Sequence, residues 1–146
     1  MLSKSSIEHK EIQMNASMEI HFPGGRKVYS DYKGFTIKTD QSKEDGGDNT
    51  ASTPSDLFFA AVGSCMGLYA LDFCKRRKID PGQLKISVDV RSHDKTHLVE
   101  KMIFNIDLAP EFPQKYTSAL IRSMKLCYLK KHFEFPPQFE FVTHQQ

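Results

Sequence analysis

The fold of this chain is decided by one stretch, Thr53-Pro-Ser-Asp-Leu-Phe-Phe-Ala-Ala-Val-Gly-Ser-Cys-Met-Gly-Leu-Tyr-Ala-Leu-Asp-Phe-Cys-Lys-Arg-Arg-Lys-Ile79. Thr53 is a favourable N-cap, Pro54 suits the first helical position, and Asp56 can complete a capping box. From Leu57 to Leu71 nearly every side chain is apolar or small. The pattern predicts a long helix with no face polar enough to be left in water, so it must be covered on all sides.

Cys65 lies at the centre of this helix, between Gly63 and Gly67. Each glycine costs a helix roughly 1 kcal/mol relative to alanine, so the pair needs an offsetting gain. One such gain is the close approach of another backbone, and the other is room for a substrate beside the sulfur. Both interpretations stay open at this point.

Composition bounds the class of protein. The 146 residues fit a single domain, 1–146, and 39% hydrophobic residues with mixed charges can build a core rather than a disordered chain. The net charge of +2 says little about partners. We find no apolar run long enough to span a bilayer and no signal peptide, and we therefore expect a cytoplasmic protein without a membrane partner. In that reducing compartment three cysteines argue against a disulfide framework.

The segment before the helix alternates apolar and polar residues. It predicts an antiparallel meander of three strands, at Ile12 to Phe22, Arg26 to Tyr32 and Phe35 to Thr39. The polar, glycine-rich stretch from Asp40 to Ser52 predicts a mobile loop, either a lid over Cys65 or a plain surface connection.

After the helix, Asp80-Pro81-Gly82 predicts a stop and a turn, and alternation over Leu84 to Val90 and Met102 to Leu108 predicts a hairpin. Pro110 and Pro113 are expected to open a second helix that runs to about Lys131, with Cys127 on its buried stripe. A final strand, Phe133 to Val142, contains Pro136-Pro137 and suits a sheet edge.

The predicted order is therefore βββ-α-ββ-α-β, an α+β fold. One sheet of this size can cover only one side of an apolar helix. A second copy of the chain would cover the rest, so we expect a homodimer whose central helices pack together.

Geometry separates the three cysteines. Cys65 and Cys74 are nine residues apart, about 180° around the helix and roughly 13 Å along it, too far for a disulfide. Cys74, beside Lys75-Arg76-Arg77-Lys78, is expected to be a partly exposed bystander thiol. Cys127, on the other helix, can meet Cys65, but its spacing is equally compatible with two buried structural cysteines.

Several motifs together resemble the OsmC/Ohr family of peroxide-handling proteins. They are the run from Pro54-x-x-Leu57 to Cys65, the basic helix end at Lys75 to Lys78, Leu84-Lys-Ile-Ser-Val-Asp-Val and Met124-Lys-Leu-Cys127. The resemblance extends from about Gly24 to Cys127. It implies an intertwined homodimer with two central helices packed against antiparallel sheets and active sites at the subunit interface. It also implies a thiol-dependent peroxidase for organic hydroperoxides that binds no metal or organic cofactor and is regenerated by an external dithiol.

Carried over by residue, the resemblance makes Cys65 the peroxidatic cysteine, Cys127 the resolving cysteine and Arg26 the cation that activates the thiolate. The physical argument agrees, because Cys65 lies about three turns into its helix, too deep for the N-terminal dipole to lower its pKa much. The thiolate would become a sulfenic acid, which condenses with Cys127 until a dithiol reduces the disulfide.

Two departures from the family pattern favour the OsmC-like branch over Ohr proper. The glutamate that Ohr proteins carry after the motif proline is Ser55 here, and Asp56 either replaces it or serves only the capping box. The residues after Cys127, Tyr128-Leu129-Lys130, lack the family's proline.

Other classes of function remain to be weighed. A non-catalytic OsmC-like protein would bind a small hydrophobic or thiol-bearing ligand at the dimer interface, and would form no Cys65–Cys127 disulfide on oxidation. Nucleic-acid binding through Lys75 to Lys78 is disfavoured, because a basic cluster at a helix C-terminus complements the helix dipole. His93 and His97 flank a predicted turn without metal-ligand spacing, so we expect no metal site.

Overall fold

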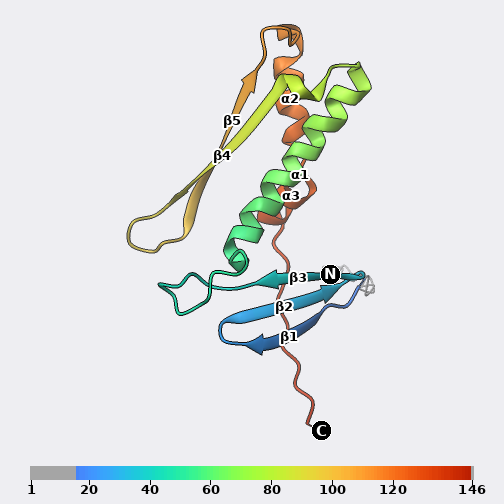
Figure 1. Cartoon of the computed structure of the whole chain (residues 1–146). Coiled ribbons are helices and arrows are strands. Elements are labelled where there is room, and N and C mark those ends of the chain that lie inside the picture. Colours follow the sequence, from blue (N-terminus) through green and yellow to red (C-terminus); the bar gives the residue numbers. More distant parts are fainter. Residues whose placement is uncertain (1–15, 146) are drawn as a thin grey trace, which may run out of the picture. The chain divides into compact units, whose positions relative to one another are not determined.

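The computed structural model describes residues 16–145, and the α+β fold predicted from the sequence is confirmed. Its elements, with η for 3-10 helices, are β1 (Glu19–Gly24), β2 (Lys27–Tyr32), β3 (Phe35–Thr39), α1 (Pro54–Arg77), η1 (Pro81–Gln83), β4 (Leu84–Ser92), β5 (Val99–Leu108), η2 (Gln114–Tyr116), α2 (Thr117–Met124) and α3 (Tyr128–Glu134) (Figure 1). The chain divides into two compact units, the first ending at Asp56 and the second beginning at Leu57.

The first unit contains the predicted meander, an antiparallel sheet in the order β1-β2-β3. Tyr32 pairs with Phe35 across a turn whose two central residues, Lys33 and Gly34, have φ of 49° and 82°. Two positive φ values are typical of a type I′ turn, which matches the twist of a hairpin. The first strand is shorter than predicted, because it begins at Glu19, and Ile12 to Asn15 lie outside the described residues.

The loop between β3 and α1 is built around Asp40, whose side chain is fully buried. The Asp40 carboxylate accepts hydrogen bonds from the Thr50 amide at 3.0 Å, the Thr50 hydroxyl at 2.7 Å and the Gln41 amide at 2.8 Å. The Thr50 hydrogen bonds above all lower the pKa of Asp40 to about 2. Gly47 passes so close to Gln41 that a Cβ there would lie 2.1 Å from the Gln41 carbonyl oxygen. The loop is thus held by a buried charge and a tight backbone contact.

The predicted capping box at the start of α1 is confirmed. The Asp56 amide donates to Thr53 Oγ1 at 3.2 Å, and the Thr53 amide donates to Asp56 Oδ2 at 3.1 Å. The helix ends at Arg77, after which Lys78 has a φ of 56°. By length and composition α1 could cross a bilayer, so the prediction that no apolar run is long enough is wrong. The core helix of a soluble protein passes the same test.

The second unit places α1 beside the predicted hairpin, in which β4 and β5 pair from Leu84–Leu108 to Ser92–Val99. Its core is a cluster of buried apolar side chains from α1, the loops and α2. They are Ala70, Phe73, Cys74, Ile79, Phe112, Leu120 and Met124. The core fixes α2 against α1, and with it the start of α3.

The predicted second helix is not continuous. It is divided into η2, α2 and α3, and the chain leaves helical geometry at Cys127, which has φ −44° and ψ 124°. The Cys127 amide still donates to the Met124 carbonyl at 3.1 Å, so the break is a turn closed by a hydrogen bond. Neither glycine nor proline marks this break in the sequence.

The predicted final strand is wrong. Phe133 and Glu134 belong to α3, and residues 135–145 form no strand. Pro136 and Pro137 supply no backbone N–H, so two donors of a strand ladder are missing at its centre. The aromatic side chains of this segment are largely exposed, up to 91% for Phe141.

Candidate active site

Two of the three thiols meet in the second unit. Cys65 lies halfway along α1 and Cys127 lies between α2 and α3, and their sulfur atoms are 2.8 Å apart. Cys65 is half-buried, whereas Cys127 has no exposed surface. Both sulfurs are free thiols at a separation from which a disulfide, with an S–S bond of about 2.05 Å, needs little movement.

Packing between α1 and α2 produces this proximity. Leu120 on α2 is fully buried in the same core as Phe73 of α1. One turn further along α2, the Ser123 hydroxyl donates to the Tyr69 carbonyl at 3.3 Å. Because both contacts lie within two turns of Cys127, the packing of α2 on α1 positions Cys127 beside Cys65.

The environment of Cys65 favours its thiolate. Burial alone raises the pKa of Cys65, but hydrogen bonds from the Cys127 thiol and from the Leu129 and Tyr128 amides outweigh it and lower the pKa below its ordinary value. Tyr128 and Leu129 are the first two residues of α3. The sequence analysis missed these two donors, because it carried one unbroken helix through Cys127.

The neighbouring thiol is shifted in the opposite direction. Burial raises the pKa of Cys127, and so does its hydrogen bond to Cys65. A thiol at 2.8 Å from a thiolate keeps its proton, because two adjacent negative charges repel each other. The opposite shifts make Cys65 the more acidic thiol of the pair and Cys127 the one that holds its proton more strongly.

Cys74 is not the partly exposed bystander that the sequence suggested. Its side chain has no exposed surface and belongs to the core cluster with Phe73 and Leu120. Burial, and then the charge of Asp80, raise the pKa of Cys74. The basic cluster begins one residue later, at Lys75, and does not bring Cys74 to the surface.

The other two candidate residues, Arg26 and Asp56, belong to the first unit, whereas the thiol pair lies in the second. Arg26 is an exposed residue in the turn between β1 and β2 of the first unit. Asp56 is exposed, and its Oδ2 atom also accepts the Thr53 hydroxyl at 2.8 Å. Its capping role is thus established, and a catalytic role for Arg26 or Asp56 stays a prediction.

An apolar pocket of ≈ 450 Å³ lies between residues of α1, α3 and the segment after α3, and neither Cys65 nor Cys127 lines it. Ala61, which lines it, lies one turn before Cys65 on α1, and Leu129, which also lines it, lies two residues after Cys127. The lining is almost entirely apolar, and its residues are Phe58, Ala61, Val62, Leu129, His132, Phe133, Pro136, Pro137 and Phe139. The pocket suits a hydrophobic molecule.

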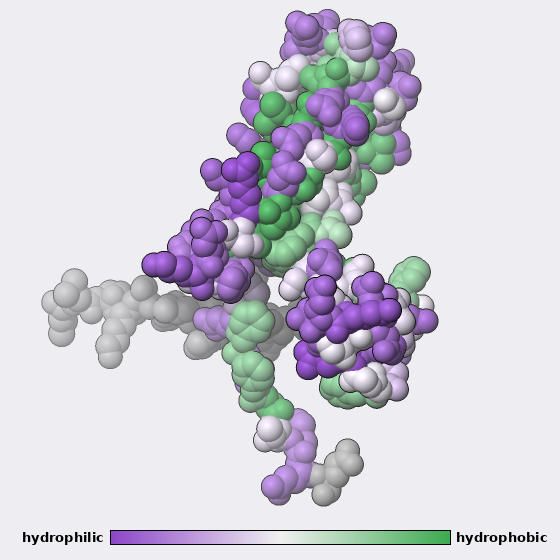
Figure 2. Space-filling view, turned by 60° about the vertical axis from the view of Figure 1, so that its left-hand side comes forward, coloured by the Kyte–Doolittle hydropathy of each residue, from purple (hydrophilic) through white to green (hydrophobic). Residues whose placement is uncertain are grey.

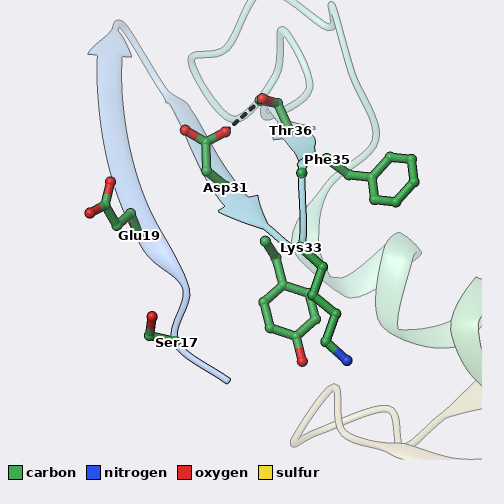
Figure 3. A pocket seen from close by; sticks show the side chains of 8 residues that line it. Ser17, Glu19, Asp31, Lys33, Phe35 and Thr36 are labelled. Atoms are coloured by element: carbon green, nitrogen blue, oxygen red, sulfur yellow. Dashed lines mark hydrogen bonds between the residues drawn. The ribbon is translucent and has the colours of Figure 1, made fainter. Parts of the chain in front are cut away.

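A polar hollow in the first unit has a different character. Figure 3 shows Asp31, Glu19 and Lys33 around it, with Phe35 pointing away. Hydrogen bonds from Thr36 and His21, each 2.6 Å long, lower the pKa of Asp31. No cysteine lines this hollow, and no group of three potential metal ligands occurs in the described part of the chain.

Comparisons with known proteins agree with this architecture. The family model described as OsmC-like protein matches residues 46–142. No curated protein matches the sequence. A Psychrobacter arcticus structure, named for osmotic stress induction and detoxification response, has a TM-score of 0.69 at 18% identity. The match covers 83% of this chain and 90% of that one.

Two further structures share the fold. An organic hydroperoxide resistance protein OsmC from Legionella pneumophila has a TM-score of 0.52 at 16% identity, with coverage of 84% of this chain and 91% of that one. A Vibrio cholerae protein named for organic hydroperoxide resistance, with captopril in one of its active sites, has a TM-score of 0.52 at 17% identity, with coverage of 84% and 88%. Because the family model spans more than half of the chain, this protein belongs to the OsmC-like family.

Proposed function

We propose that this protein is a cysteine-based peroxidase that reduces organic hydroperoxides, and also hydrogen peroxide, in defence against oxidative stress. The observation that carries the proposal is the 2.8 Å contact between a thiol of lowered pKa, Cys65, and a buried thiol of raised pKa, Cys127. A peroxidase of this kind needs a nucleophilic thiolate with a resolving thiol beside it. The names of the Legionella and Vibrio structures point to the same class of substrate.

The reaction follows from the arrangement. The Cys65 thiolate attacks the outer oxygen of the hydroperoxide, the O–O bond breaks, and Cys65 becomes a sulfenic acid while the alcohol leaves. Cys127 then attacks the Cys65 sulfur and displaces hydroxide, which leaves a disulfide and, after protonation, water. An external dithiol returns both sulfurs to thiols, and no metal or bound organic cofactor takes part.

We further propose that the working unit is a homodimer in the cytoplasm. Along α1, Phe58 and Leu68 are each about half exposed in a single chain, at 50% and 54%, and a Cβ added to Gly67 would meet no atom within 4 Å. Figure 2 shows hydrophobic side chains gathered between hydrophilic ones on the second compact unit of the chain. Half-exposed residues on a central apolar helix are those that a second copy would cover. Light scattering during gel filtration tests this with a predicted mass of twice 16.7 kDa.

The apolar pocket supports a second candidate function, the binding of a small hydrophobic or thiol-bearing ligand without turnover. Its lining is almost wholly apolar, and it includes Ala61, one turn before Cys65 on α1. The Vibrio structure holds captopril in one of its active sites. In this case both thiols would survive exposure to hydroperoxide, and the ligand would protect Cys65 from alkylation.

Consumption of cumene hydroperoxide with dithiothreitol as reductant separates the two functions. We expect turnover by wild type and none by Cys65→Ser, because serine is not a nucleophile of comparable strength. Cys74→Ser is the matched control, since Cys74 is buried in the core and separate from the thiol pair. Equal turnover by wild type and Cys65→Ser would exclude the proposed chemistry.

A further inference from the structure

The proposed reaction leaves one proton unassigned. When a thiolate breaks the O–O bond of an alkyl hydroperoxide, the outer oxygen stays on sulfur with its hydrogen, and the leaving group departs as an alkoxide. An alkoxide is a strong base, so its departure is faster when an acid protonates it in the transition state. Conversely, Cys127 must lose a proton before it attacks, because the thiolate is the nucleophile.

In the structure, the thiol that must lose a proton, Cys127, lies beside the sulfur at which the alkoxide is released, that of Cys65. Cys127 is the side chain that donates to the Cys65 sulfur, across 2.8 Å. It is fully buried, so its proton has no direct path to solvent. Once the negative charge moves from Cys65 to the leaving oxygen, the Cys127 proton loses its acceptor at the moment a stronger base forms beside it.

Other groups near the site do not offer such a proton. The Tyr128 and Leu129 donors to Cys65 are backbone amides, which are far weaker acids than a thiol. His132 of α3 is exposed, and its Nδ1 atom lies 3.1 Å from the Tyr128 carbonyl rather than against Cys65. On the side of the hairpin, a Cβ added to Gly63 would meet a methyl carbon of Val88 at 3.6 Å. Within the described second unit, Cys127 is thus the acidic hydrogen-bond donor to Cys65.

We propose that Cys127 is the general acid of the peroxidase step, which rests on the proposed function above. Cys65–S⁻, R–O–OH and Cys127–SH give Cys65–S–OH, R–OH and Cys127–S⁻. Two electrons pass from the Cys65 sulfur to the peroxide, and the proton passes from Cys127 to the alkoxide. The same transfer creates the resolving thiolate, which attacks Cys65 and expels hydroxide. Resolution is thereby coupled to reduction of the peroxide.

The test compares two oxidants of similar size whose leaving groups differ in basicity. Cumene hydroperoxide releases an alkoxide and needs the acid, whereas perbenzoic acid releases a weakly basic carboxylate and does not. Single-turnover rate constants for both are measured by quenched flow as residual peroxide, on wild type and Cys127→Ala. Their ratio cancels any change in the pKa of Cys65 or in the folded fraction, because the same thiolate attacks both oxidants.

We expect the ratio of the cumene hydroperoxide rate constant to the perbenzoic acid rate constant to fall about 100-fold in Cys127→Ala, the typical size of a general-acid contribution. Cys127→Ser, close to the native shape, should also lower it, because a hydroxyl is a weaker acid than a thiol. Cys74→Ala is the control and should keep the wild-type ratio. A ratio that both Cys127 variants leave within about threefold of wild type overturns the proposal. Wild type and Cys65→Ser reacting alike would instead refute the peroxidase function itself.

Discussion

Leu120→Ala should loosen the contact that carries Cys127 to Cys65. Leu120 is fully buried in the core between α1 and α2. Alanine removes three carbon groups, worth about 2.4 kcal/mol at roughly 0.8 kcal/mol each. A cavity that does not fully collapse adds about 1 kcal/mol, so the free energy of unfolding should fall by about 3–4 kcal/mol.

The neighbouring residue gives a matched control, because Ile121 on the same helix is 38% exposed. Ile121→Ala leaves less buried surface unfilled and should cost about 1 kcal/mol. Urea unfolding followed by circular dichroism, at one fixed protein concentration, gives both values. The Leu120 variant should also form the Cys65–Cys127 disulfide more slowly after one equivalent of hydroperoxide. Equal losses of stability in the two variants would refute the assignment of Leu120 to the core.

Four further changes test other parts of the structure. Asp56→Ala removes the capping box and should cost about 1 kcal/mol in urea unfolding; a loss of turnover per folded molecule would show that Asp56 also acts in catalysis. Gly47→Ala forces a Cβ against the Gln41 carbonyl and should lower the free energy of unfolding by roughly 1–3 kcal/mol. An unchanged free energy of unfolding would show that the loop accepts the Cβ. Because the pKa of Asp40 is lowered to about 2 from 3.8, its stabilising contribution is complete above pH 4 and is lost as pH falls towards 2. The difference in urea midpoint between wild type and Asp40→Asn should shrink over this range, and a constant difference would contradict the role of Asp40. Since the pKa of Cys65 is lowered from 9.0, alkylation by iodoacetamide should rise with pH around a midpoint below 9, and Cys127→Ala should move the profile to higher pH; an unmoved profile would show that the Cys127 hydrogen bond does not stabilise the thiolate.

The elements with strong local signals were predictable from sequence. The α1 helix combines an N-cap, a proline at its first turn and a long apolar run, and it begins within a residue of its expected start. The β4–β5 hairpin shows clear two-residue alternation, and its pairing follows that alternation. Both signals are local, because they depend on residues close together in the chain.

The errors occur where tertiary contacts decide. The break at Cys127 carries no glycine or proline, so helical spacing continues through it in the sequence. Residues 135–145 have the apolar residues of a strand but no paired neighbour in a single chain. The basic residues after Cys74 favour an exposed position, but the Cys74 side chain is buried in the core.

The candidate site was predictable in part. Spacing allowed Cys65 and Cys127 to meet, and the family resemblance selected them, but the same spacing fitted two structural cysteines equally well. The two amides that donate to Cys65 were beyond sequence reasoning, because backbone donors at the start of α3 become visible only once the helix break is known.

The most direct test of the peroxidase account is peptide mapping of the protein after one equivalent of cumene hydroperoxide. The account predicts a Cys65–Cys127 disulfide in wild type and a trappable sulfenic acid on Cys65 in Cys127→Ser, with Cys74 still a thiol. Intact Cys65 and Cys127 thiols after that exposure, with slow oxidation of Cys74 alone, would contradict it.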